Sequence, residues 1–392
     1  MDNQQPVTVA QRRARLGRRH HLATRAATIE DVAADLVGLH SSDPASVYLA
    51  AWARVRNFTP AALERALYEE RTLLRMLGMR RTMFVVDPEL GAVMDAACTQ
   101  ALVGGERRRL IGLLEDQGIA RDGGRWLRRV SDRTVAAIDE RGTATATELT
   151  KVVPELREKL VMGEGKKWGA TVGVSTRVLF LLATEGRIVR GRPRGQWLSS
   201  QYEWASLRTW VDPLPVIAPA DARAALLRRW LHTYGPATLR DLTWWAGWTQ
   251  AHGRAALAAI DAVEVELDDG VGYVLPDDVA PVRAPRRWVA LLPGLDPTIM
   301  GWKERDWYLG PHATRLFDRN GNAGPTVWSD GRIVGGWAQR ADGVIDTELL
   351  EPVDATATRA VAKEADALTE WLDGKVVTPR FRTPLEREIA AR

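Results

Sequence analysis

Polar side chains are crowded into one short segment, Gly38-Leu-His-Ser-Ser-Asp-Pro44, which lies between two apolar helix-like stretches. His40 and Ser42 are two residues apart, and histidine is the side chain best able to exchange a proton near neutral pH. The segment is therefore a candidate for catalysis. A structural interpretation is also open: Ser42 or Asp43 caps a helix that begins at Pro44, and His40 is a half-buried residue with its hydrogen bonds satisfied.

A second segment combines aromatic and basic residues, over 302–308 and 317–325. A hairpin of this composition, next to an Asn-Gly turn, can present cations to a phosphate backbone. An ordinary loop between strands explains the same residues. The side chains that we expect to contact nucleic acid here are Lys303, Arg305, Arg319, Asn320 and Asn322.

Several other kinds of chemistry are disfavoured. The only cysteine, Cys98, excludes a disulfide scaffold and a Cys-ligated metal site, and the six histidines lack the spacing of metal ligands. The glycines of Gly163–Gly169 match neither a dinucleotide fingerprint nor a Walker loop, and we expect a loop with no strand leading into it. We therefore predict no metal and no cofactor.

Composition indicates a packed, multidomain protein. The chain has 392 residues, 45% of them hydrophobic, with 54 basic against 50 acidic residues. No apolar run approaches the ~20 residues that a membrane span needs. The basic stretch Gln11–His21 has no hydrophobic segment behind it, so we expect an exposed basic arm and not an export signal. The single cysteine and the lack of an export signal or membrane span predict a cytoplasmic protein that is not bound to a membrane. With the expected nucleic-acid contacts, we also expect it to be a monomer associated with the nucleoid.

Two stretches of the chain repeat one pattern. Gly142-Thr-Ala-Thr-Ala-Thr-Glu-Leu-Thr150 aligns with Gly235-Pro-Ala-Thr-Leu-Arg-Asp-Leu-Thr243, and each contains a threonine with an acid three residues on, the sequence of a capping box. After the first copy we expect a helix over 175–184 and two strands around a turn within 187–197. Helices followed by a hairpin predict a winged helix in each stretch.

A third, more diverged winged helix is predicted over about 28–88, where Thr28 and Asp43-Pro44 each begin a helix and 81–86 alternates like a strand. From residue 286 onward, short apolar strands separated by Asn-Gly and Asp-Gly turns predict a small β-barrel, followed by a helix over 355–372. The fold class is α+β, with units over 1–115, 116–205, 206–280 and 281–392.

These motifs together resemble the AlkZ/YcaQ-like winged-helix DNA glycosylases, in order, from about Leu16 to Glu351. The matching segments are Gly38-Leu-x-x-x-Asp-Pro-x-Ser-x-Tyr-Leu-Ala-x-Trp-Ala-Arg54, Leu74-Arg-x-x-x-x-Arg80-x-Thr82, Gly235-Pro-Ala-Thr-x-x-Asp-Leu, Leu292-Pro-x-x-Asp-Pro and Gly331-Arg-Ile-Val-Gly-x-Trp337. The resemblance implies a C-shaped molecule, with three tandem winged helices around a small barrel. It also implies excision of alkylated purines from damaged double-stranded DNA and unhooking of interstrand crosslinks.

The catalytic signature of that family is Gln-x-Gln or Gln-x-Asp directly before Asp-Pro, and here His40 and Ser42 occupy its polar positions. An N-alkylated purine leaves easily because it is cationic, so His40 could orient the attacking water or accept its proton, and Ser42 could hold its other side. We expect His40, with a pKa near 6.5, to matter more than Ser42. No lysine lies nearby, which favours a monofunctional mechanism.

The resemblance also bears on DNA contacts. We expect Arg80, Arg81 and Thr82 to bind DNA, although Arg81-Thr82 replaces the Gly-Thr usual in the family. A chain that kept the scaffold and lost the two glutamines is also consistent with a DNA-binding or regulatory protein without catalysis. Base release from an alkylated duplex distinguishes the two functions.

Overall fold

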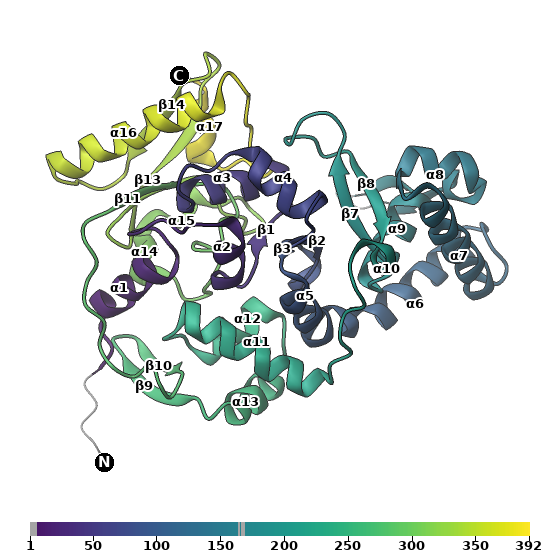
Figure 1. The fold of residues 1–392 in the computed structure, drawn as a ribbon, viewed down its shortest axis with the longest axis horizontal. Helices are drawn as coiled ribbons and strands as arrows, with labels where there is room; N and C mark the ends of the chain where they lie inside the picture. Colours follow the sequence, from purple (N-terminus) through teal and green to yellow (C-terminus); the bar gives the residue numbers. More distant parts are fainter. Residues whose placement is uncertain (1–5, 164, 166–168) are drawn as a thin grey trace.

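The computed structural model describes residues 6–163, 165 and 169–392, in which α-helices combine with antiparallel sheets (Figure 1). The first segment alternates helices and strands in the order helix, strand, helix, helix, strand, strand. Its elements are α2 (Ile29–Asp35), β1 (Leu39–His40), α3 (Pro44–Arg54), α4 (Pro60–Tyr68), β2 (Leu74–Leu77) and β3 (Met83–Val86). The helix starts predicted at Thr28 and Asp43-Pro44 are confirmed, because both side chains cap the helix that follows.

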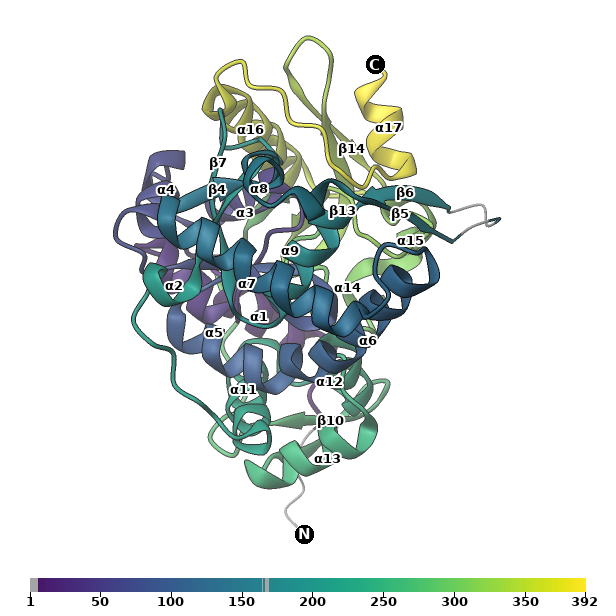
Figure 2. The same cartoon turned by 90° about the vertical axis from the view of Figure 1, so that its right-hand side faces the viewer.

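The second segment has the same order with one insertion. Its elements are α7 (Gly123–Arg141), β4 (Thr143–Thr145), α8 (Ala146–Val152), η3 (Pro154–Arg157), β5 (Lys159–Met162), β6 (Ala170–Gly173), α9 (Val174–Thr184), β7 (Ile188–Pro193) and β8 (Tyr202–Ser206). Two expectations were wrong. The partner of β7 is 202–206, outside the stretch 187–197 in which both strands were predicted. Strand β5 leads into Gly163–Gly169, of which 164 and 166–168 lie outside the described residues. The β5–β6 pair projects from the surface (Figure 2).

The third segment repeats the pattern with a single bridge in place of the first strand. Ala237 pairs with Tyr273, and the elements are α11 (Pro219–Tyr234), α12 (Leu239–Ala246), α13 (Gln250–Ala259), β9 (Val263–Leu267) and β10 (Gly270–Val274). The capping boxes predicted from Thr145 and Thr238 are both present. That these three segments are winged helices with the predicted boundaries stays a prediction, as does the C-shape.

One six-stranded sheet connects the first two segments, in the order β1-β3-β2-β7-β8-β4. Strand β2 meets β7 through the pair Arg75 and Arg190. Along the chain the two segments are linked by α5 (Pro88–Met94), a π-helical turn (Asp95–Thr99) and α6 (Gln100–Asp116). In Figure 1 the second segment extends to one side of the main body.

The barrel prediction was wrong. Strands β11 (Val289–Leu292), β12 (Thr326–Ser329), β13 (Arg332–Gln339) and β14 (Ile345–Leu349) form an open sheet in that order, because β11 and β14 do not pair. Helix α16 (Ala355–Leu372) contacts β11 and β14, and α17 (Pro384–Ala390) contacts β13. The individual strands and the helix over 355–372 lie close to where the sequence predicted them.

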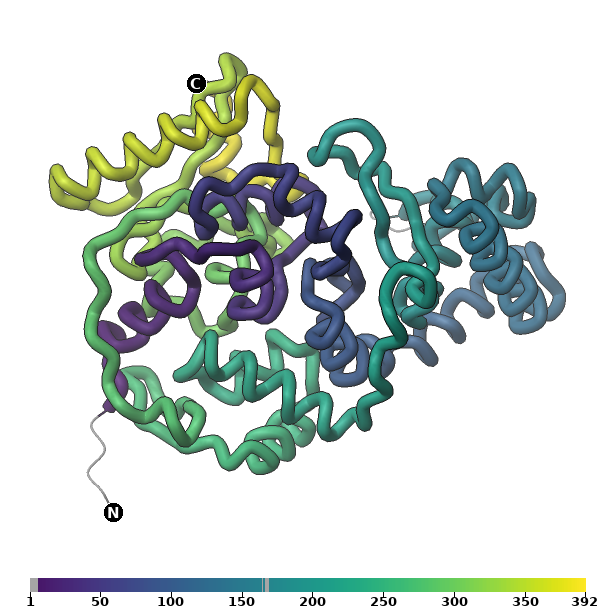
Figure 3. Tube along the Cα trace, in the orientation of Figure 1, coloured from purple at the N-terminus to yellow at the C-terminus, as the bar shows by residue number. Residues whose placement is uncertain are grey.

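The expected exposed arm is a largely buried helix, α1 (Val9–Arg19). Arg12, Arg15 and His20 are buried, and Arg15 forms an ion pair with Asp278. Figure 3 shows the chain entering α1 beside the β9–β10 pair, where Val7 bridges Leu267. These arginines therefore hold the N-terminus to the protein.

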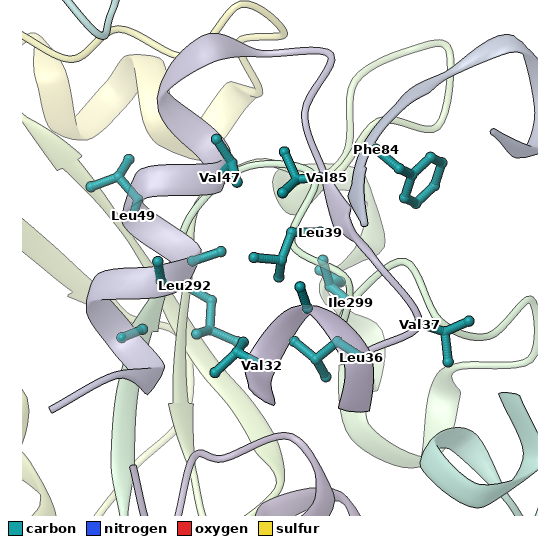
Figure 4. Close-up of a cluster of buried hydrophobic side chains, with 14 of the residues drawn as sticks. Val32, Leu36, Val37, Leu39, Val47, Leu49, Phe84, Val85, Leu292 and Ile299 are labelled. Atoms are coloured by element: carbon teal, nitrogen blue, oxygen red, sulfur yellow. The ribbon is translucent and has the colours of Figure 1, made fainter. Parts of the chain in front are cut away.

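Two main hydrophobic cores organise the molecule. Residues between Leu110 and Ile188 form a core of their own, whereas the first and third segments share one core with the C-terminal sheet. Figure 4 shows Leu39 of β1 inside the shared core. Val85 of β3 lies beside Leu39, and Phe84, the residue before it, points to the other side of β3. None of the helices in the described ranges is long and apolar enough to cross a membrane.

Candidate functional site

Asp43 fixes the start of helix α3 and binds the C-terminal segment. Its Oδ1 accepts a hydrogen bond from the Ala45 amide at 3.1 Å, and its Oδ2 accepts one from the Arg380 amide at 2.8 Å. Burial raises the pKa of Asp43 despite these hydrogen bonds and the charge of Arg380. The capping interpretation of Asp43 is therefore confirmed, with an added contact to Arg380 that the sequence did not suggest.

Ser42 is half-buried beside that cap. Its Oγ accepts a hydrogen bond from the Met83 amide at 3.1 Å, which leaves the hydroxyl hydrogen for another acceptor. The Arg380 guanidinium donates to the Ser42 carbonyl at 3.3 Å. Ser42 is thus held by strand β3 on one side and by the C-terminal segment on the other.

His40 lies in a different environment. It is 8% exposed, packs edge-on against Phe84 with ring centroids 5.3 Å apart, and its Nδ1 has no hydrogen-bond partner among the described residues. Burial, with a further contribution from the charge of Arg80, lowers the pKa of His40 to about 3. The imidazole is therefore neutral at pH 7, and neither the expected pKa near 6.5 nor the expectation that both ring nitrogens are satisfied holds.

A cavity of about 430 Å³ opens beside Ser42. Its lining includes three aromatic side chains, Phe180, Trp204 and Phe381, and the guanidinium groups of Arg81, Arg190 and Arg380. A second cavity, of about 560 Å³, shares Ser42, Arg190 and Arg380 with the first. His40 lines neither cavity, so the structure does not bring His40 and Ser42 to one common space.

Arg80 and Arg305 come together on a tryptophan. The guanidinium carbons of Arg80 and Arg305 lie 4.2 and 5.1 Å from the centroid of the Trp244 ring, and Arg305 also lies 4.8 Å from that of Phe317. Cation–π contacts of this kind orient a guanidinium while its remaining donors stay free for a ligand. Residues far apart in the sequence thus form one cationic surface, and exposed Lys303 lies two residues before Arg305 in the chain.

The other residues predicted to contact DNA are of two kinds: some are bonded to other parts of the protein, and some are exposed. Thr82 donates a hydrogen bond to the Met79 carbonyl at 2.7 Å, and Asn322 donates its side-chain amide to Asp318 at 2.9 Å. Arg81 forms an ion pair with Glu106, so its charge is already compensated. The remaining two side chains, Arg319 and Asn320, are exposed.

Of the three arginines that line the cavities, sequence reasoning named Arg81 and missed Arg190 and Arg380. Arg190 lies in the stretch predicted as two strands around a turn, and Arg380 lies after the helix predicted over 355–372, but no spacing connects either of them with Ser42. Sheet pairing of β7 with β2 brings Arg190 to the site, and the hydrogen bonds of Arg380 to Asp43 and to the Ser42 carbonyl bring Arg380 there. Among the described residues, no group of three or more His, Cys, Asp or Glu side chains is placed to hold a metal ion.

Comparisons with known proteins point to one family. The family model described as DNA glycosylase AlkZ-like matches residues 33–371. Among solved structures, the Streptomyces sahachiroi DNA glycosylase AlkZ is similar, with a TM-score of 0.69 and 20% sequence identity over 94% of this chain and 98% of that one. No curated protein sequence matches.

Proposed function

The chain belongs to the AlkZ-like DNA glycosylase family, and from that premise we propose that it releases alkylated purines from double-stranded DNA by hydrolysis of the N-glycosidic bond. The observation that carries this proposal is the position of Ser42. It occupies a polar position of the family signature, and it also lines a cavity with three aromatic walls. An N-alkylated purine is flat and positively charged. Its ring can stack on an aromatic side chain, and the face of an aromatic ring attracts a cation.

The proposed reaction needs little acid catalysis. As the bond from C1′ to the base nitrogen breaks, its electron pair neutralises the positive charge of the base, so the leaving group needs no proton. Water adds to C1′ and loses one proton to solvent. Ser42, whose hydroxyl hydrogen is free, orients that water through a hydrogen bond.

His40 has a positioning role in this proposal. It pairs with Phe84 across β1 and β3, and the Met83 amide next to Phe84 holds Ser42. A neutral imidazole with a pKa of about 3 is a weak base, which favours Ser42 over His40 at the reacting atoms and reverses the order expected from the sequence. Removal of His40 is expected to act through the strand that fixes Ser42.

Phosphate contacts are proposed for the surface around Trp244. Arg80 and Arg305 are oriented there by the same ring, with Lys303 exposed beside them. Arg319 and Asn320 are exposed on the neighbouring turn. Contacts of this type hold DNA in register without reading its sequence.

A catalytically inactive DNA-binding protein is the second candidate. The burial of His40, away from both cavities, favours it, because only Ser42 of the two signature residues then reaches a ligand. The two candidates differ in base release alone, since both require binding to DNA.

Single-turnover assays on a duplex with one N7-methylguanine, followed by cleavage of the abasic site, test the proposal. We expect release by the wild type and a loss of about tenfold in Ser42→Ala, the effect of one hydrogen bond of ~1.4 kcal/mol. Ser175→Ala, outside the lining of the cavity, is the matched control. A crosslinked duplex in parallel tests unhooking.

The His40 variants separate positioning from proton transfer. His40→Gln is expected to retain more activity than His40→Ala, and the wild-type rate is expected to be flat from pH 6 to 8, because the imidazole does not titrate there. A rate that falls with a pKa near 6.5 and disappears in both variants would make His40 the base. No release by the wild type from several alkylated duplexes would favour the inactive alternative.

A further inference from the structure

Two arginines face each other where the first two segments join. Arg75 of β2 and Arg190 of β7 are directly paired across the sheet, so their side chains leave it on the same face. Burial lowers the pKa of Arg190 to about 10, and the charges of Arg75 and Arg380 contribute to the decrease. Three cations therefore lie within electrostatic reach of one another.

Arg75 is almost completely enclosed, at 1% exposed, and the ionisable groups that act on it are tyrosines, with no acidic partner in the part of the chain that the structure describes. Its Nη1 donates to the Tyr202 hydroxyl, whereas Nε and Nη2 have no hydrogen-bond partner there. The Tyr202 ring lies 4.8 Å from the Arg75 guanidinium carbon and 4.9 Å from that of Arg190. The nearby hydroxyls of Tyr48 and Tyr68 are also buried and unpartnered.

This arrangement is costly for the protein alone. A buried charge without a counterion is strongly destabilising, and like charges directly opposite each other on two strands repel. Contact with the Tyr202 ring offsets part of the cost. An anion that met these groups would supply the missing charge, and a guanidinium presents donors in the fork geometry that suits a phosphate.

Access to Arg190 and Arg380 comes from the two cavities, which both arginines line together with Ser42. Arg75 lines neither cavity, but it donates a hydrogen bond to Tyr202, which lines the second. The aromatic walls of the first cavity suit a base, and the shared arginines suit the charged backbone attached to it.

We propose that Arg190 and Arg380, supported by Arg75, bind one backbone phosphate of the DNA strand that carries the target nucleotide. This inference rests on the proposed function and extends it to the strand contact beside Ser42.

Neutral-backbone scanning tests the phosphate contact. Duplexes with a single abasic-site analogue carry one methylphosphonate at successive positions of the target strand, and binding is measured by fluorescence anisotropy. We expect the wild type to lose about tenfold in affinity at one position near the analogue, typical of a charge-assisted hydrogen bond. Arg380→Gln and Arg190→Gln should lose a similar factor on the unmodified duplex and nothing more at that position.

The variants are chosen so that folding does not decide the outcome. Arg380 is exposed, so Arg380→Gln tests the contact without a burial change, and Arg340→Gln removes an equal charge from the turn that contains Asp342. Arg340→Gln should retain the full effect of the methylphosphonate. Equal sensitivity at every position, or the same loss in the variants as in the wild type, would overturn the proposal.

Inorganic phosphate provides the second arm. If it raises the melting temperature of the wild type but not of Arg380→Gln, while no methylphosphonate position matters, the site takes a free anion and the DNA contact is refuted. Because the assay measures binding, it is independent of base release. A position-specific effect without release of any alkylated base would support the phosphate site and contradict the glycosylase proposal.

Discussion

Arg54 and Arg75 are both buried arginines with opposite surroundings. Arg54 is 0% exposed and binds both carboxylate oxygens of Asp296, at 2.6 and 2.8 Å, with further hydrogen bonds to Thr298 and to the carbonyls of His20 and Ala50. Each of its nitrogens has a partner. Arg75 is equally buried, and within the described ranges its guanidinium has one hydrogen bond, to Tyr202.

The difference separates a structural ion pair from a charge that can act on a ligand held by the neighbouring Arg190. Arg54 joins α3 to the loop before Ile299 and to the end of α1, so its charge is fully used within the protein. Arg75 contributes no comparable contact, and a charge retained at a cost in stability points to function. Removing the partner of Arg54 should therefore be far more damaging to the fold than removing Arg75 itself.

The largest effect is expected from Asp296→Asn. This change leaves the Arg54 charge buried and uncompensated, which costs about 3–5 kcal/mol. Urea denaturation of the variant and of the surface control Asp342→Asn measures the difference, and the control should stay within ~0.5 kcal/mol of the wild type. A loss below ~1 kcal/mol in Asp296→Asn would show that the Arg54–Asp296 ion pair does not stabilise the fold as proposed.

A pH-dependent effect, smaller than that of Asp296→Asn above about pH 5, is expected from His40, another buried group whose charged form lacks a partner among the described residues. Because the pKa of His40 is lowered to about 3 in the folded protein and is ~6.5 when unfolded, the unfolded state binds more protons below pH 6.5. Stability should therefore fall by up to ~1.4 kcal/mol per pH unit between 6.5 and 3. Melting curves of His40→Gln should show a weaker decline, and an equal decline would place the acid sensitivity elsewhere, for example at His20.

The smallest effects on stability are expected from surface arginines. Their variants show how much the loss of an exposed arginine costs, for comparison with the buried Arg54 and Arg75. Arg81→Ala and Arg319→Ala should each change the free energy of unfolding by within about 0.5 kcal/mol. Arg319→Ala should reduce the slope of log affinity against log salt by about 0.9 if it contacts a phosphate. Arg81→Ala should change that slope less, because Glu106 already pairs with its guanidinium.

Local signals were predictable from the sequence, and long-range ones were not. The helix starts at Asp43 and at Thr238 depend on residues two or three positions away, so the caps could be recognised directly. The barrel failed because closure depends on whether β11 meets β14, which no local pattern determines. Arg15 was expected on the surface because its partner Asp278 lies on a distant part of the chain.

The candidate site shows the same division. The motif around Ser42 was found because both its composition and its resemblance to a family are local. Arg190 and Arg380 reach it only through sheet pairing and a backbone hydrogen bond. The pKa of His40 depends on its burial, and the spacing between His40 and Ser42 in the sequence does not show whether His40 is buried.

The most direct test of the comparison is one variant, Arg75→Met, measured for both stability and DNA affinity. Methionine fills a similar volume without charge, and replacing a poorly compensated buried charge by an apolar side chain is often neutral or stabilising. We expect a free energy of unfolding equal to or above that of the wild type, with affinity for an abasic-analogue duplex reduced about tenfold. A variant that loses more than ~2 kcal/mol of stability, or that binds DNA as tightly as the wild type, would contradict the supporting role of Arg75 in phosphate binding.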